Sequence, residues 1–260
     1  MTILRTLYNR QPVLTVYGFI LVAIALATAV LQGFDLRQLD GVDVWVKPTK
    51  FLVSVAVFAL TSAWFFGYVR PERRRGLAMG YVVWGIIGFG SFEDTWIIWQ
   101  AAHGARSHFN HADLFVSVMY ALMGIGAILL VATTLPLANE IARRPIAGMR
   151  LDYRVAVVMG LILTCLLGGG AGLYMGAQHG HSVGLDGGHF PLFGWNRMGG
   201  DLRVAHFFAM HMEQALPLLA AVVARLPGVT RWLLLALGAG AGIALAGFTW
   251  LQAVMGHPFL

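Results

Sequence analysis

Two carboxylic acids stand out because they lie inside long apolar stretches of the chain. Glu93 lies ten residues before His103, and Glu213 lies ten residues after Arg203, which on a helix is about 15 Å. An ionisable side chain at that depth in a membrane is costly and marks a functional site by default. We therefore expect Glu93 and Glu213 to act as catalytic acid or base, or as ligands. The alternative is a protonated carboxyl that joins two helices by hydrogen bonds.

The residues after Glu93 repeat with helical spacing. Trp96, Gln100 and His103 follow it at three, seven and ten residues, so the four side chains share one face of a helix. This spacing predicts that Trp96 and Gln100 contact a cofactor or substrate. His103 is then a candidate metal ligand near the end of the helix.

A second cluster begins at His206. At about 100° per residue, Glu213 falls within about 20° of His206 on a helical wheel. His211 and Gln214 lie on the flank of that stripe, and Gln214 is a further candidate for cofactor contact. Pro217 continues the stripe and removes a backbone hydrogen bond, so we expect the helix to open near Glu213.

All nine histidines fall on one side of the membrane in the topology derived below. Neutral imidazoles with carboxylates suit zinc, iron or copper, and two axial histidines would suit haem b. The candidate metal ligands are His103, His108, His111, His206 and His211. The alternative for each loop histidine is a solvated surface side chain.

His108 and His111 flank the predicted start of a helix. Asn110 is its expected N-cap, and Asp113 is placed to reach back as in a capping box. The positive end of that helix favours a neutral imidazole or a bound anion nearby.

The composition shows that membrane-spanning helices must position these residues. Of the 260 residues 58% are apolar, 18 are Lys or Arg and 12 are Asp or Glu, and the mean hydropathy is +0.71. Soluble domains carry about twice this share of charge, so the soluble, disordered and disulfide-stapled classes are excluded. The single cysteine, Cys165, also excludes a Cys-rich metal site.

Seven stretches are apolar and, at about 20 residues each, long enough to cross a bilayer. The predicted spans are Val13–Gly33, Phe51–Val69, Leu77–Gln100, Leu114–Leu137, Ala156–Met175, Val204–Ala224 and Leu233–Met255. The first is expected to be a retained helix, because its apolar run exceeds that of a signal peptide. We therefore predict an all-α, seven-transmembrane-helix bundle that forms a single domain over residues 1–260.

The distribution of basic residues predicts the orientation of this bundle. Twelve lie in one set of connecting segments: Arg5, Arg10, Arg70, Arg73, Arg74, Arg75, Arg143, Arg144, Arg150, Arg154, Arg225 and Arg231. Six lie in the other set: Arg37, Lys47, Lys50, Arg106, Arg197 and Arg203. The richer set is expected in the cytoplasm, which places the N-terminus inside a bacterial cytoplasmic membrane and the C-terminus and candidate ligands outside. The positive charge then faces anionic membrane lipids, and no nucleic-acid partner is expected.

Two predicted outer loops carry further candidate residues. Segment 176–203 is rich in glycine and histidine, and a loop of this length is usually a lid or a binding loop; plain flexibility is the alternative. Its candidate ligands are His179, His181, Asp186 and His189. In the first outer loop, Trp45, Lys47 and Lys50 are expected to anchor the chain at the membrane interface.

Several short motifs together resemble a family of bacterial integral membrane proteins. They are VWVKPTKF, SHFN, GDLRVAHF followed by MHMEQALPL, and the terminal WLQAVMGHP. The resemblance covers most of the chain and implies the seven-helix fold, with no activity carried over. The placing of histidines and acids at one end of seven helices also resembles the membrane zinc hydrolases related to alkaline ceramidases. Their paired HxxxH motif is absent here, because His206 and His211 are five residues apart.

Three functions fit these residues. The first is a metal-dependent membrane enzyme, an oxidoreductase or a hydrolase, that acts on a lipidic or amphiphilic substrate. The second is a redox protein that binds haem or a quinone-like ligand. The third is a proton-coupled transporter or channel that uses Glu93 and Glu213 as relay groups. A scaffold without chemistry is the fallback.

Overall fold

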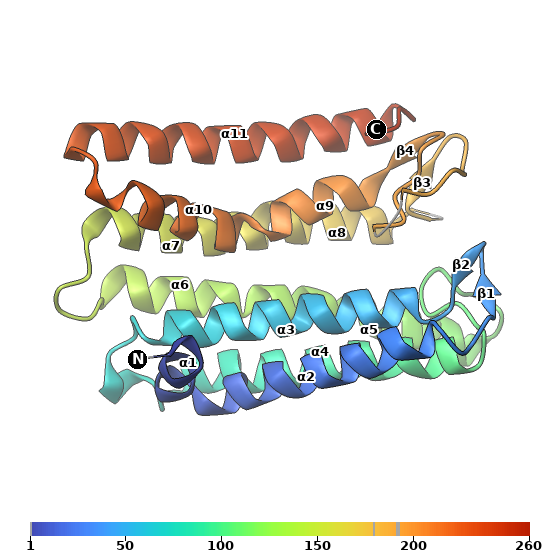
Figure 1. The fold of residues 1–260 in the computed structure, drawn as a ribbon, viewed down its shortest axis with the longest axis horizontal. Helices are drawn as coiled ribbons and strands as arrows, with labels where there is room; N and C mark the ends of the chain where they lie inside the picture. Colours follow the sequence, from blue (N-terminus) through green and yellow to red (C-terminus); the bar gives the residue numbers. More distant parts are fainter. Residues whose placement is uncertain (1, 179, 191–192) are drawn as a thin grey trace. The chain divides into compact units, whose positions relative to one another are not determined.

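The computed structural model describes residues 2–178, 180–190 and 193–260. The protein is mostly helical (71%; Figure 1), which confirms the all-α class. The chain forms two compact units, Met1–Thr133 and Thr134–Leu260. His179, one of the candidate loop ligands, lies outside the described residues.

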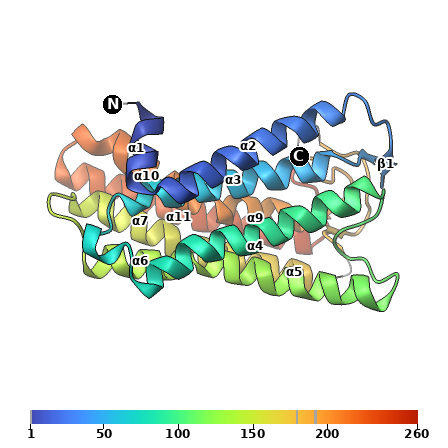
Figure 2. The same cartoon turned by 90° about the horizontal axis from the view of Figure 1, so that it is seen from below.

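In the first unit, long helices that are consecutive in the sequence pack against one another. Its elements are α1 (Ile3–Arg10), α2 (Pro12–Leu31), β1 (Gln38–Leu39), β2 (Val42–Asp43), α3 (Val46–Phe66), the 3-10 turn η1 (Pro71–Arg73), α4 (Leu77–Ala102) and α5 (Leu114–Ala132). Proline at the first position of α2 costs no hydrogen bond, because the first N–H groups of a helix have no partner within it. α2 packs on α3, α3 on α4 and α4 on α5 (Figure 2). Leu21, Leu52 and Val55 form part of the core where α2 meets α3.

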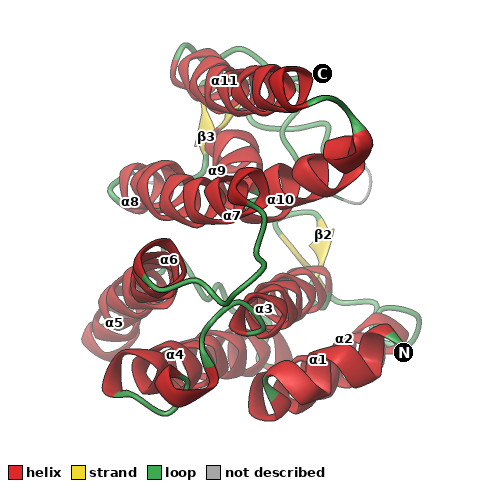
Figure 3. Ribbon diagram, turned by 90° about the vertical axis from the view of Figure 1, so that its left-hand side faces the viewer, coloured by secondary structure: helices red, strands yellow, loops and turns green. Residues whose placement is uncertain are grey.

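The second unit contains two irregular helices. Its elements are α6 (Thr134–Arg143), α7 (Leu151–Leu163), the π-helical turn η2 (Thr164–Gly168), α8 (Gly169–Gly176), β3 (Ser182–Val183), β4 (Gly200–Asp201), α9 (Leu202–Met210), α10 (Met212–Val222), the 3-10 turn η3 (Val223–Arg225) and α11 (Gly228–Val254). α7, η2 and α8 run on from one another, whereas α9 and α10 meet at a break. α7 packs on α6 and α10, and α9 packs on α8 and α11 (Figure 3).

Several of these helices are long and apolar enough to cross a membrane, as expected of an integral membrane protein. Among the described residues they are Pro12–Leu31, Val46–Phe66, Leu114–Arg143, Leu151–Gly176 and Gly228–Val254, with the bent pair α9 and α10 as a sixth candidate. α4 has 26 residues, long enough to span a bilayer, but it is not among these apolar helices. The predicted count of seven spans therefore stays a prediction, because it requires that the bent pair and α4 each cross the membrane.

Four predicted span boundaries differ from the structure by five residues or more. α7 begins at Leu151 and α11 at Gly228, where starts at Ala156 and Leu233 were expected. α3 begins at Val46 rather than at Phe51, so Lys47 and Lys50 lie in its first turns and not in a loop. The helical stretch predicted to end at Leu137 continues to Arg143. In all four cases the helix extends beyond the apolar pattern, because a helix end can carry charged side chains that reach out of the apolar layer.

The predicted cap of α5 is wrong. Asp113, not Asn110, is the N-cap, and its side chain accepts a hydrogen bond from the Val116 N–H at 2.9 Å. Asn110 instead accepts from the Ala112 N–H at 3.1 Å within the preceding loop. Asn and Asp are equally good caps, so the sequence alone does not choose between them.

The glycine-rich loop is fixed at its base. β3 pairs with β4, and Asn196 and Asp201 are both 2% exposed. Asn196 donates to the Leu185 carbonyl at 2.7 Å, and Asp201 accepts from the Asn196 N–H at 2.8 Å and pairs with Arg203 at 2.6 Å. Burial acts to raise the pKa of Asp201, but hydrogen bonds from Arg203 and its charge outweigh burial and lower it.

Candidate functional site

The second unit has a helix break beside its candidate residues. α9 ends at Met210 and α10 begins at Met212, with a bend of 45° between them. Pro217 predicts such an opening, and the structure places it at His211. Glu213 therefore lies in the first turn of α10, where backbone N–H groups without helical partners favour negative charge.

The hydroxyl of Thr164 supplies hydrogen bonds at this break. It donates to the Met210 carbonyl at 3.2 Å and accepts from the Glu213 N–H at 3.0 Å. Thr164 is fully buried and begins the π-helical turn η2, a type of irregularity that is frequent at functional sites. The irregular turn of one helix thus stabilises the break in the other.

Glu213 ends a short chain of polar side chains. It is fully buried, and its Oε1 accepts a hydrogen bond from Gln214 Nε2 at 2.8 Å. Gln214 Oε1 lies 3.2 Å from His211 Nδ1; because an amide oxygen only accepts, that ring nitrogen carries a proton. Glu213 Oε2 has no hydrogen-bond partner among the described residues. A bare carboxylate is costly in such surroundings, so this oxygen is a place to hold a proton.

Glycines let the two irregular helices approach closely. A Cβ on Gly160 would lie 2.8 Å from the Met212 carbonyl oxygen, so a larger residue does not fit. Gly172 leaves room for the ring of His206, whose Nδ1 lies 2.9 Å from the Gly168 carbonyl oxygen. Since a carbonyl only accepts, Nδ1 of His206 is the donor, and in a neutral ring Nε2 then keeps the lone pair.

Aromatic side chains of the glycine-rich loop reach this polar chain. Phe193 stacks on Trp195 with ring centroids 4.6 Å apart, and Trp195 meets Phe207 edge-on at 5.6 Å. Phe207 contacts the ring of His211 at 4.4 Å. Trp195 is buried, so these rings cover part of α9 instead of lying free on a surface.

The first unit buries two adjacent acids on α4. Glu93 is 4% exposed and Asp94 is 3% exposed. Within the described part of the chain, Glu93 Oε1 and both carboxyl oxygens of Asp94 have no hydrogen-bond partner. One turn earlier, Ser91 donates to the Tyr17 hydroxyl at 3.1 Å. Asp94 is not among the residues predicted from helical spacing, because it lies about 100° from Glu93 on a helical wheel. Two successive acids in an apolar stretch are the sequence signal that points to it.

Lys47 connects these acids to the loop after α4. Its Nζ lies 3.1 Å from His108 Nδ1 and 5.8 Å from the centre of the Phe51 ring, and its charge acts on the Glu93 carboxyl. An ammonium only donates, so His108 Nδ1 accepts. Burial first, and the charge of Lys47 second, hold the pKa of His108 well below its usual value. Lys47 thus contacts the loop after α4 within this unit, and its anchoring at the membrane interface stays a prediction.

Trp96 and Gln100 hold the loop between α4 and α5. Trp96 Nε1 donates to the Ser107 carbonyl at 3.2 Å, and Gln100 Nε2 donates to the Arg106 carbonyl at 3.1 Å. Both side chains are buried. His103 caps α4 and its Nδ1 donates back to a carbonyl of the same helix. Cofactor contact by Trp96 and Gln100 stays a prediction, because these bonds account for their burial.

Two candidate histidines meet on one tyrosine. The Tyr120 ring contacts His108 at 6.0 Å and His111 at 5.6 Å between ring centroids. Among the described residues, no group of three or more His, Cys, Asp or Glu side chains is arranged to hold a metal ion. Binding of zinc, iron or copper, and of haem b, remains a prediction from the sequence.

Comparison with protein families, with curated proteins and with solved structures finds no match for this chain. Its function is therefore inferred from the residues and geometry of each unit.

Proposed function

We propose that the protein is a proton-coupled transporter or proton channel of the bacterial cytoplasmic membrane, in which Glu213 takes up and releases the proton. In this proposal the six candidate spans and α4 make seven transmembrane helices. The N-terminus lies in the cytoplasm and the C-terminus outside, as the basic residues favour.

The observation that carries this proposal is the place of Glu213. A fully buried carboxyl lies in the first turn after a break in an apolar helix pair, with one oxygen held by Gln214 and the other unpaired among described residues. Transporters bind their coupling ions at such discontinuous helices, and carboxyls inside the membrane serve as proton relays. Gln214 holds the Glu213 carboxyl in position, and His211 extends the polar chain toward the aromatic rings of the loop.

Glu93 and Asp94 provide a second candidate proton site, in the first unit. Two adjacent carboxyls with unpaired oxygens cannot both carry a charge at low cost, so they suit the exchange of a single proton. Lys47 supplies a positive charge that acts on the Glu93 carboxyl. Each unit therefore has an acid able to take part in proton movement.

The test is proton flux in liposomes that contain the purified protein and an interior pH-sensitive dye. With a potential set by potassium and valinomycin, wild-type protein should acidify or alkalinise the interior faster than empty liposomes. Glu213→Gln should lower the protein-dependent rate at least about tenfold, a change of about 1.4 kcal/mol in the barrier. Glu72→Gln, the same substitution at an exposed site in η1, should leave it unchanged. Equal rates for Glu213→Gln and wild type would contradict the proposal.

A metal-dependent membrane enzyme is the second candidate, and the orientation of His206 favours it. A ligating histidine usually donates its other ring N–H to a carbonyl or carboxylate, and His206 donates Nδ1 to the Gly168 carbonyl. Nε2 is then the nitrogen that would bind zinc, iron or copper, and the substrate would be lipidic, amphiphilic or quinone-like.

Elemental analysis of protein purified without a histidine tag tests this second candidate. About one equivalent of metal per chain should disappear in His206→Ala and persist in His257→Ala, which changes an exposed histidine of the C-terminal tail. Iron would call for an absorption spectrum to identify haem b. A wild-type protein that holds no metal even after reconstitution would rule the candidate out.

A further inference from the structure

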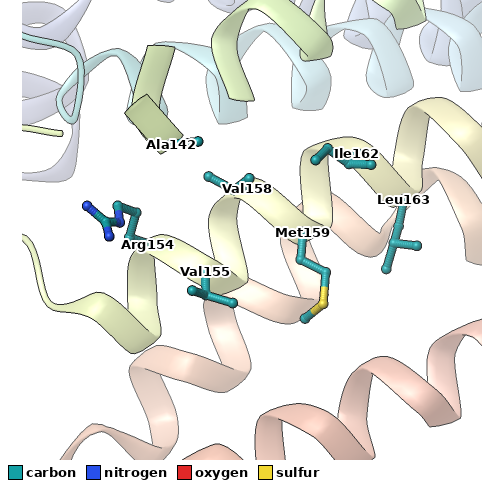
Figure 4. Close-up of a pocket in the computed structure, with 7 residues that line it drawn as sticks. All are labelled: Ala142, Arg154, Val155, Val158, Met159, Ile162 and Leu163. Carbon is teal, nitrogen blue, oxygen red and sulfur yellow. The ribbon is translucent and has the colours of Figure 1, made fainter. Parts of the chain in front are cut away.

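The second unit carries an apolar groove on α7. It is lined by Ala142 of α6 and by Arg154, Val155, Val158, Met159, Ile162 and Leu163 of α7, and its volume is about 370 Å³ (Figure 4). The α7 residues recur every three to four positions, so they form one stripe along the helix. The volume is at the low end of ligand sites, and every lining side chain but Arg154 is apolar.

Among the described residues, Arg154 has no side-chain partner, whereas Arg144, Arg150 and Arg231 each pair with an acid. Arg150 and Arg231 both pair with the Asp152 carboxylate, at 2.7 Å and 3.0 Å, and Arg144 pairs with Glu140 at 3.5 Å. The Arg154 side chain makes no hydrogen bond or ion pair with any residue that the structure describes. The groove thus combines an apolar floor with an uncompensated positive charge at one end.

We propose that this groove binds one acyl chain of an anionic glycerophospholipid, whose headgroup phosphate pairs with Arg154. The groove runs along the candidate span Leu151–Gly176, where acyl chains are the surrounding solvent. Arg154 lies one turn from the start of that span, at the level expected for lipid headgroups, and Arg143 and Arg150 lie close by in the sequence. Basic sites between helices on the cytoplasmic side are known to bind such headgroups. The proposal goes beyond the proton-linked role and does not depend on it.

Native mass spectrometry of delipidated protein, titrated with phosphatidylglycerol or phosphatidylcholine of identical acyl chains, tests this site. Wild-type protein should retain one phosphatidylglycerol with higher affinity than phosphatidylcholine. Arg154→Gln should weaken phosphatidylglycerol binding roughly fivefold, the factor expected for one basic side chain at an anionic surface. Arg225→Gln is the control, because Arg225 is exposed on the same predicted side and is not part of the groove.

A second variant tests the groove itself. Val158→Trp fills the groove without changing any charge and should reduce binding of both lipids, with circular dichroism and gel filtration as checks of folding. If this variant does not fold, the comparison of phosphatidylglycerol binding by Arg154→Gln and Arg225→Gln still tests the proposal. Three results would each overturn the proposal. They are an equal loss of phosphatidylglycerol binding in Arg154→Gln and Arg225→Gln, equal retention of the two lipids by wild type, and no retained lipid because another part of the chain fills the groove.

Discussion

Hydrogen-bond partners give two of the candidate histidines opposite roles for the same ring nitrogen. Nδ1 of His206 donates to a carbonyl oxygen, whereas Nδ1 of His108 accepts from the Lys47 ammonium. Protonation of His108 at Nδ1 would place a second positive charge beside the Lys47 ammonium. His108 is therefore held in its neutral form, and it resists protonation as the pH falls.

This arrangement predicts how the pH dependence of stability changes when His108 is replaced. The pKa of His108 is lower in the folded protein than the unfolded value of about 6.5. Below that pH the unfolded chain binds a proton that the folded chain does not bind. The free energy of unfolding therefore decreases as the pH is lowered. His108→Gln should remove this contribution, and its melting temperature in detergent should fall less than that of wild type between about pH 7 and about pH 5.

The control is His257→Gln, at an exposed position in the tail. Its melting temperature should follow the wild-type curve over the same pH range. Parallel curves for His108→Gln and wild type would show that His108 is not held in its neutral form.

The burial of a single residue was predictable from the sequence where it follows from the residue's depth in an apolar stretch. Glu93 and Glu213 are buried as the apolar stretches around them predict. Lys47 and Thr164 could not be found in this way, because their partners are on other segments of the chain. The pattern along one helix shows which residues lie on the same face of that helix. It does not show which side chain of another segment contacts them.

At the scale of elements, the break between α9 and α10 is stabilised by a neighbouring helix. Thr164 bonds one backbone group on each side of the break, so its hydroxyl should matter more than that of an ordinary buried threonine. Thr249 provides the comparison, since it is buried to the same degree but bonds carbonyls of its own helix.

Replacing these two threonines should therefore have unequal effects. Thr164→Val should destabilise the protein by about 1–3 kcal/mol, because it leaves the Glu213 N–H buried without a partner. Thr249→Val should cost about 0.5 kcal/mol or less, and Thr164→Ser should retain most of the wild-type stability because it keeps the hydroxyl. Thermal unfolding in detergent measures the differences. Equal losses for the two valine variants would contradict the role assigned to Thr164.

The elements themselves were largely predictable. Runs of apolar residues located the long helices, and Pro217 indicated an opening near Glu213, which the structure places at His211. The π-helical turn was not predictable, since nothing in TCLLG specifies a π-helical turn in place of an α-helix. Its irregular backbone depends on contacts with α9 and α10, which exist only in the folded unit.

At the scale of the whole molecule, the apolar stretches predict seven crossings, and the basic residues predict a C-terminus outside the cytoplasm. α4 is the decisive element, because it carries Glu93 and Asp94 and is not among the six candidate spans. If α4 crosses the membrane, its two ends lie on opposite sides.

Reporter insertions test this crossing. Alkaline phosphatase should be inactive when inserted after Arg75, before α4, and active when inserted after Gly104, beyond it, because the enzyme folds only outside the cytoplasm. Fusion after Leu260 should also be active. Equal activity at the first two sites would mean that α4 does not cross and that the seven-helix topology is wrong.

The most direct test of the central claim is infrared difference spectroscopy of the protein in lipid as the pH is changed. We expect carbonyl-stretch bands of protonated carboxyls to appear as the pH is lowered. The band that belongs to Glu213 should be missing in Glu213→Gln and should persist in Glu72→Gln. This result would establish that the buried Glu213 exchanges protons with the solution. A difference spectrum that is the same in wild type and Glu213→Gln would contradict the account.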